Sequence, residues 1–174
     1  MVDRVTVAAI GSVLLIRLGQ SPGIHSDDEL AAALRRLAED DTLQAGVLAG
    51  ISGVVACGEE GGRHIGTPPN KPLVAAVGSD GVPVTRGLLL WCEQIVAATD
   101  VGVSAARPAA PGETIAAALA LADEAGRREQ LARAVSARLV RDAQHVMRVT
   151  AHTERMISIL HEWQRSDIQH ADHT

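Results

Sequence analysis

Short apolar runs separated by polar or glycine-rich breaks fill the first half of the chain. The first two runs, VTVAA at residues 5–9 and VLLIRL at residues 13–18, are aliphatic and partly β-branched, and they flank Gly11-Ser12. Such runs on either side of a glycine-containing turn predict a β-hairpin.

A helix is predicted after this hairpin. Ser26, with Glu29 three residues later, forms a capping box ahead of apolar residues at helical spacing, so we expect a helix over residues 27–40. Residues 45–49 and 54–56 follow as short apolar runs with a glycine between them, and both predict strands. The order of strand, helix and strand indicates a ββα unit.

The middle of the chain continues this mixed α/β pattern. A loop rich in Gly and Pro spans residues 58–69, and the near-continuous apolar run at residues 73–77 is typical of a strand buried on both faces of a sheet. A short helix is predicted over residues 88–91, and strands are predicted at residues 95–98 and 101–104.

The apolar spacing becomes helical after Pro111-Gly112, and no strand candidate follows. We therefore expect an α/β core over residues 1–110 and C-terminal helices over residues 111–174, within a single domain. Three apolar stripes run along these helices, and such stripes pack against a core or against another subunit. Their members are Ile115, Ala118, Leu119 and Ala122 in the first, Leu131, Val135, Leu139 and Val146 in the second, and Met156, Ile159, Leu160 and Trp163 in the third.

Length and charge narrow the class of protein. The chain has 174 residues, and 47% hydrophobic residues are ample for the core of one domain. It has no uninterrupted apolar stretch of about 18 residues, so neither a membrane span nor a secretory signal is expected, and a cytoplasmic location is predicted. The net charge of -5, with Lys71 as the only lysine, argues against binding to nucleic acid. The many Arg and Ala residues are typical of a bacterial coding bias.

Cysteines and histidines give little support for metal chemistry. Cys57 and Cys92 lack CxxC spacing and are expected to be reduced thiols. His145 and His152 are placed on one helix face by their spacing, where histidines are usually surface or interface residues. We therefore predict no metal and no resident cofactor.

One segment of the chain resembles a known family. Residues 71–93, KPLVAAVGSDGVPVTRGLLLWCE, are similar to the KPVIAAVxGxAxGGGxEL…CD segment of the crotonase (enoyl-CoA hydratase/isomerase) superfamily. VLLIRL at residues 13–18 and GVVACGEE at residues 53–60 resemble the family's first strand and its xAFxAGAD loop. The resemblance implies an α/β fold, a crotonase-like spiral of ββα units with a helical C-terminal region, in a trimmed form.

Members of this family hold an acyl-thioester carbonyl with two backbone N–H groups, and this oxyanion hole stabilises the developing enolate. The resemblance places these donors at Cys57 and Val84. Backbone donors survive a change of side chain, but Pro83, Val84 and Thr85 replace the family's three glycines, and β-branched residues narrow the site. A coenzyme A thioester is the ligand that the resemblance implies.

The family's two catalytic glutamates fall on Gly87 and Arg107, and neither residue exchanges a proton near neutral pH. Asp80, in the GSDG loop, is the best substitute base, with an ordinary Asp-Gly turn as the alternative. Arg107 pairs either with an anionic ligand or with a structural carboxylate. Three residues after the first donor either point into the site or remain solvated: Glu59, Glu60 and His64.

These observations favour a non-catalytic or auxiliary crotonase-like protein that binds or stabilises a partner enzyme in an acyl-CoA or polyketide pathway. The alternatives are an enzyme of the hydratase/isomerase type, acting on an acyl thioester through a retained oxyanion hole, and a simple acyl-CoA binder. The resemblance also implies a homo-oligomer, a trimer or a multiple of three, formed through the C-terminal helices.

Overall fold

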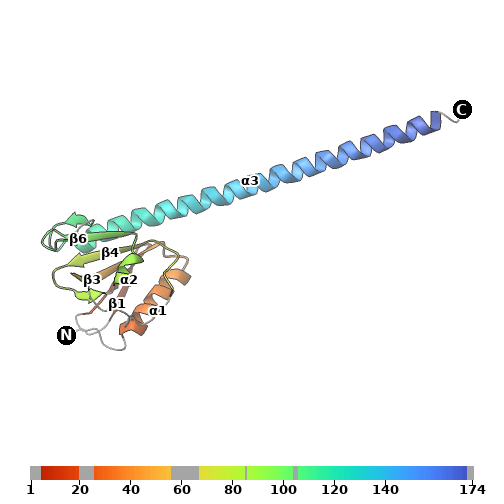
Figure 1. Ribbon diagram of the computed structural model, residues 1–174. Coiled ribbons are helices and arrows are strands. Elements are labelled where there is room, and N and C mark those ends of the chain that lie inside the picture. The colour runs from red at the N-terminus through yellow and green to blue at the C-terminus, as the bar shows by residue number, and fades with distance from the viewer. Residues whose placement is uncertain (1–4, 20–25, 56–66, 85, 104–105, 172–174) are drawn as a thin grey trace. The chain divides into compact units, whose positions relative to one another are not determined.

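The chain divides into two compact units, Met1–Gln130 and Leu131–Thr174. The first unit is a mixed α/β structure and the second is helical (Figure 1). The computed structural model describes residues 5–19, 26–55, 67–84, 86–103 and 106–171.

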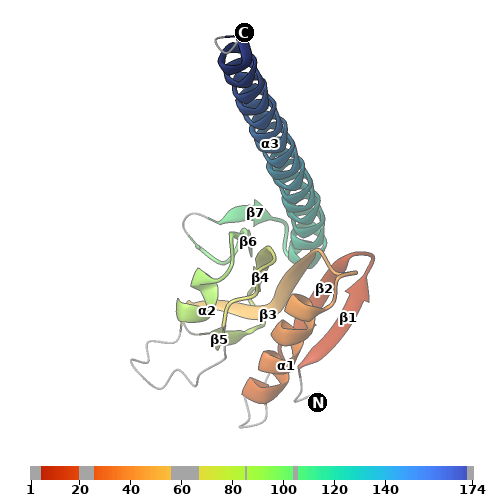
Figure 2. The same ribbon diagram turned by 90° about the vertical axis from the view of Figure 1, so that its right-hand side faces the viewer.

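A twisted sheet organises the first unit, and its described strands number seven (Figure 2). The main path runs in the order β1-β2-β3-β4-β6-β7, and β5 pairs with β3 beside that path. Only β1 and β2 are antiparallel, and the remaining pairs are parallel. The strands are β1 (Thr6–Ile10), β2 (Val13–Arg17), β3 (Ala45–Val55), β4 (Leu73–Gly78), β5 (Val82–Val84), β6 (Gln94–Ala98) and β7 (Arg107–Ala109).

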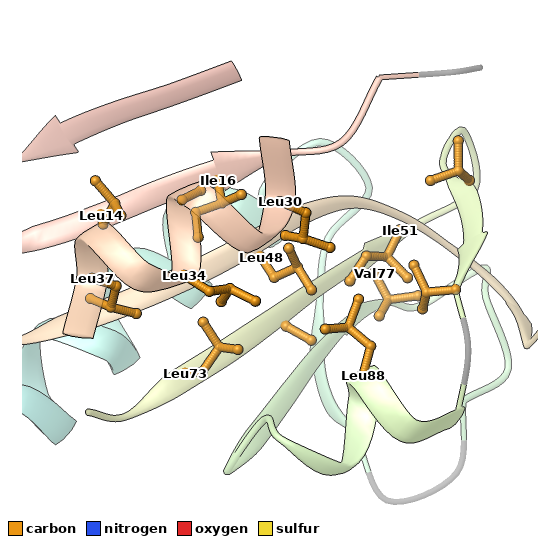
Figure 3. Packing of buried hydrophobic residues seen from close by; sticks show 14 of the residues in the cluster. Leu14, Ile16, Leu30, Leu34, Leu37, Leu48, Ile51, Leu73, Val77 and Leu88 are labelled. Carbon is orange, nitrogen blue, oxygen red and sulfur yellow. The ribbon is translucent and has the colours of Figure 1, made fainter. Parts of the chain in front are cut away.

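Two helices, α1 (Ser26–Glu39) and α2 (Arg86–Leu90), pack on one face of this sheet. Because successive strand residues point to opposite faces, Leu14 and Ile16 of β2 face α1 while Val13 faces away. Figure 3 shows the leucines of α1 turned towards the strands. The fully enclosed residues of this layer include Leu14, Ile16, Leu37, Leu48, Ile51 and Leu73.

The first turns of α3 (Thr114–Ala171) cover the opposite face. Ala118 and Ala122 are fully buried there, against small residues such as Ala76 of β4. The helix approaches the sheet closely, because a Cβ placed on Gly126 would lie only 2.9 Å from the Cβ of Gln44. The absence of Phe and Tyr from the chain therefore suits a layer built from alanine and valine.

Several sequence predictions are confirmed. The hairpin forms with Gly11 at a φ of 59°, a left-handed conformation that glycine adopts easily. The helix predicted over residues 27–40 is α1, and β4 is buried on both faces as its apolar run predicted. Glu29 also ties α1 to the hairpin, since its Oε2 accepts the N–H of Val5 at 3.0 Å.

Three predictions about elements are wrong in detail. Gly50 does not separate two strands, because β3 continues through it as one irregular strand in which Gly50 has a φ of 76°. The strand predicted at residues 101–104 is absent over its described part. The chain turns there, Val101 donating its N–H to Ala98 O, and the apolar side chains of Val101 and Val103 pack on the core from this turn.

The last error concerns the C-terminal region. The three apolar stripes lie on one unbroken helix, α3, instead of several helices. In the second unit, the large apolar side chains described from Leu131 to Ile157 are 47% to 67% exposed. Among the described residues, no helix has the length and apolar character needed to cross a membrane.

Candidate functional site

A pocket of about 280 Å³ lies where the carboxyl ends of β2, β4 and β6 and the irregular middle of β3, at Gly50 and Ile51, meet the start of α3. Ligands of open parallel sheets bind beyond the carboxyl ends of the strands, so this is the natural place for a site. Asp80, the predicted substitute base, lines this pocket. Its polar lining also includes Arg17, Ser79 and Thr114.

The start of α3 gives the pocket a positive character. Ala117 donates its N–H to Glu113 O at 3.0 Å, so the N–H groups of Thr114, Ile115 and Ala116 have no acceptor within the helix, while that of Glu113 is bonded to Ala110 O at 2.9 Å. Thr114 is only 8% exposed, and the exposed guanidinium of Arg17 stands at the end of β2. A helix amino terminus and an arginine favour an anionic group, whereas Asp80 favours a hydrogen-bond donor.

Of the two predicted oxyanion donors, the structure describes Val84 but not Cys57. Cys57 lies outside the described residues, as do Glu59, Glu60 and His64. Val84 lies in β5 with a buried side chain and is paired in register with Val55 of β3. Because α2 begins at Arg86, Val84 is a strand residue and not the first residue of a helix.

The glycine-rich turn before β5 is pressed against β3. A Cβ on Gly81 would lie 2.1 Å from the carbonyl carbon of Ile51 and 2.3 Å from the backbone nitrogen of Ser52. Such a distance leaves no room for any side chain at Gly81. The backbone next to Asp80 is therefore held in place by the contact of Gly81 with Ile51 and Ser52. The Asp80 side chain itself is exposed.

Comparison with solved structures decides the fold. The chain aligns with an enoyl-CoA hydratase of Mycobacterium tuberculosis at a TM-score of 0.50 and 21% identity, covering 71% of this chain and 75% of that one. It aligns with an enoyl-CoA hydratase/carnithine racemase of Magnetospirillum magneticum at a TM-score of 0.52 and 15% identity, covering 72% and 77%. This chain has the enoyl-CoA hydratase fold. No family model and no curated protein matches the sequence.

The enoyl-CoA hydratase fold confirms the crotonase-like α/β architecture that the residue 71–93 motif predicted. On this fold, Gly87 lies exposed on α2, and a Cβ added there would meet nothing within 4 Å. Arg107 is exposed on the edge strand β7, and it forms no ion pair within the described part of the chain. Neither position carries a group that can transfer a proton near neutral pH.

Cys92 is unsuited to nucleophilic chemistry in this enoyl-CoA hydratase fold. Burial raises the pKa of its thiol to about 12, and its Sγ lies 3.7 Å from the carbonyl oxygen of Leu88. A thiol so far from ionisation is a weak nucleophile. No cluster of three or more His, Cys, Asp or Glu side chains suited to a metal occurs among the described residues.

Sequence reasoning found Asp80 but missed Arg17 and Thr114. Each of the two is the terminal residue of its element, Arg17 closing β2 and Thr114 opening α3. Their location at a strand end and a helix start could have marked them as site residues, since such ends lie together at one edge of a parallel sheet. The strand order needed to bring these two ends together is not visible in the sequence.

Proposed function

We propose that this chain is a non-catalytic, auxiliary crotonase-like protein that assists a partner enzyme handling acyl-CoA or polyketide intermediates. The observation that supports it is the pair Gly87 and Arg107 at the positions of the family glutamates. Water addition to an enoyl thioester needs a general acid and base, and these residues supply neither. The protein also self-associates in this proposal, as a trimer or a multiple of three.

The hydration of crotonyl-CoA and longer enoyl-CoA esters tests this function. The purified chain is expected to give no measurable turnover, while an active enoyl-CoA hydratase in the same buffer supplies the positive control. Turnover at about 1 per second or faster, within the ordinary enzymatic range, would overturn the non-catalytic assignment.

A second function rests on the pocket itself. In this alternative the chain is an enzyme acting on an acyl thioester, with Asp80 as the base and coenzyme A as part of the substrate. The observation that favours it is the position of Asp80 in a cavity beside Arg17 and the α3 amino terminus. The ligand's anionic groups would lie against that terminus.

A matched pair of variants separates the two functions. Where activity is found, Asp80→Asn is expected to lower it roughly a hundredfold, the usual scale for a lost general base. Asp100→Asn is the control, because Asp100 is equally an exposed loop carboxylate but does not line the pocket. Equal rates for both variants would remove Asp80 from the mechanism. Calorimetric binding of acetyl-CoA tighter than about 100 μM would favour this second function.

A further inference from the structure

The second unit has an apolar face with no partner in the chain as described. Val135, Leu139, Val146, Val149 and Met156 are between 47% and 63% exposed. Counted together with Asp142 and Thr153, they recur at alternating spacings of four and three residues, the repeat of a coiled coil. By sequence position along the α3 helix, this repeat extends from Ala132 to Trp163. We call these ten positions the heptad seam: Ala132, Val135, Leu139, Asp142, Val146, Val149, Thr153, Met156, Leu160 and Trp163.

Two seam positions are polar, and they restrict how a second copy can fit. Asp142 and Thr153 occupy the seam between apolar neighbours. In a parallel pair, Asp142 would face Asp142 of the second copy, and two carboxylates would be brought together away from water. The ion pair of Asp142 with Arg138, at 3.9 Å, lies within one helix and does not remove that repulsion.

An antiparallel pair has one register that matches both polar positions. It places Asp142 opposite the Thr153 hydroxyl of the second copy, twice by symmetry. That hydroxyl donates to Val149 O of its own helix at 3.0 Å, and in the pair it would turn to donate to the carboxylate. The same register aligns position Ala132 of one helix with position Trp163 of the other. The remaining facing pairs are Leu139 with Met156, Val146 with Val149, and Val135 with Leu160.

Neighbouring registers lose this match. A shift of one heptad in either direction sets Asp142 against Val146 or against Leu160, and each leaves a carboxylate facing an apolar side chain. The polar positions thus select a register, as buried polar residues do in other coiled coils.

The seam is large enough for a stable contact. At about 1.5 Å per residue it is about 47 Å long, and a helix is about 10 Å wide. Two such strips bury on the order of 1,000 Å², the size at which specific interfaces begin.

We propose that the heptad seam of α3 binds a second copy of itself in antiparallel orientation, with Asp142 opposite Thr153. This proposal rests on the self-association proposed above and adds a twofold contact to it.

Cysteine cross-linking of the full chain tests orientation and register. In a Cys57→Ser, Cys92→Ala background, Leu139→Cys and Met156→Cys chains are prepared separately, mixed, allowed to exchange and then oxidised. The mixture is expected to form a disulfide-linked dimer, and neither chain should do so alone, because identical positions lie about 25 Å apart along the axis. Dimers from Leu139→Cys alone would indicate a parallel pair and overturn the proposal.

A second measurement does not depend on cysteines. Val146→Asp places a charge on the seam, and Val140→Asp places the same charge off it, at a valine of similar exposure, 57% against 62%. By ultracentrifugation, Val146→Asp is expected to weaken association about tenfold or more, and Val140→Asp to change it less than about twofold. An oligomer equally insensitive to both variants would refute the seam but retain self-association, whereas a wild-type monomer would refute both.

Discussion

Gly81 is predicted to be the most sensitive glycine of the turn that carries Asp80. Replacement by alanine would place a Cβ 2.1 Å from Ile51 C, 2.3 Å from Ser52 N and 2.5 Å from Ile51 O. Carbon atoms in contact are ordinarily about 3.5 Å apart, so one strand must move by about 1.4 Å. The obstacle is backbone, which cannot turn aside as a side chain can.

The cost is set by what that movement disturbs. Ile51 is fully buried and is paired in register with Val77 of β4 and Val82 of β5. Overpacking a well-packed core costs about 1 to 3 kcal/mol, and a backbone clash at this junction belongs at the upper end. With a urea m-value of about 2 kcal/mol/M, a loss of about 3 kcal/mol lowers the unfolding midpoint by about 1.5 M.

Tryptophan fluorescence in urea measures this loss in the first unit alone. The chain has two tryptophans and no tyrosine, so a Trp163→Phe background leaves Trp91, packed against the core, as the reporter. Gly78→Ala is the control, because a Cβ there meets nothing within 4 Å and should change stability by less than about 0.5 kcal/mol. Midpoints for Gly81→Ala and Gly78→Ala that agree would refute the close approach of the turn to β3.

Two further predictions concern the core and pH. Ala118→Leu should lower the free energy of unfolding by about 1 to 3 kcal/mol, because Ala118 is fully enclosed between α3 and the sheet. Ala120→Leu, at an exposed position of the same helix, is the control and should change it little. Equal urea midpoints for the two variants would contradict this packing. Burial raises the pKa of Cys92 from 9.0 to about 12, so the unfolded thiol ionises first and stability should fall as pH rises from about 9 towards 12. Few other groups titrate in this range, since the chain has one lysine and no tyrosine. Cys92→Ala should therefore flatten the dependence of stability on pH. An unchanged slope would show that the Cys92 thiol is not the cause.

The sequence predicted elements well where hydrophobic spacing determines them. The run at residues 73–77 is buried on both faces because Leu73 and Val77 pack towards α1 and α2 while Val74 packs towards α3. Spacing failed where a turn was also apolar, as at Val101. It also failed for β7, a three-residue edge strand in which Arg107 and Pro108 are exposed and only Ala109 packs on the core.

The candidate site was less accessible to sequence reasoning for a different reason. Asp80 stood out because it is the one carboxylate of the residue 71–93 motif ahead of the closing Cys92-Glu93 pair. Arg17 and Thr114 are nearly a hundred positions apart and become neighbours of one cavity only through the order of β2, β3, β4 and β6. A long-range strand order is a property of tertiary packing, and local spacing carries little information about it.

The side chains of α3 differ in size and exposure between the two units. Up to Gln130, one face of α3 is buried, with Ala118 and Ala122 enclosed and Gly126 allowing the helix to approach Gln44. Beyond Leu131, large aliphatic side chains replace these small ones and remain exposed. An exposed apolar surface of that size is unusual in a monomeric protein and typically marks an interaction site. The change from alanine to leucine, valine and methionine along one helix therefore supports the self-association proposed for the second unit.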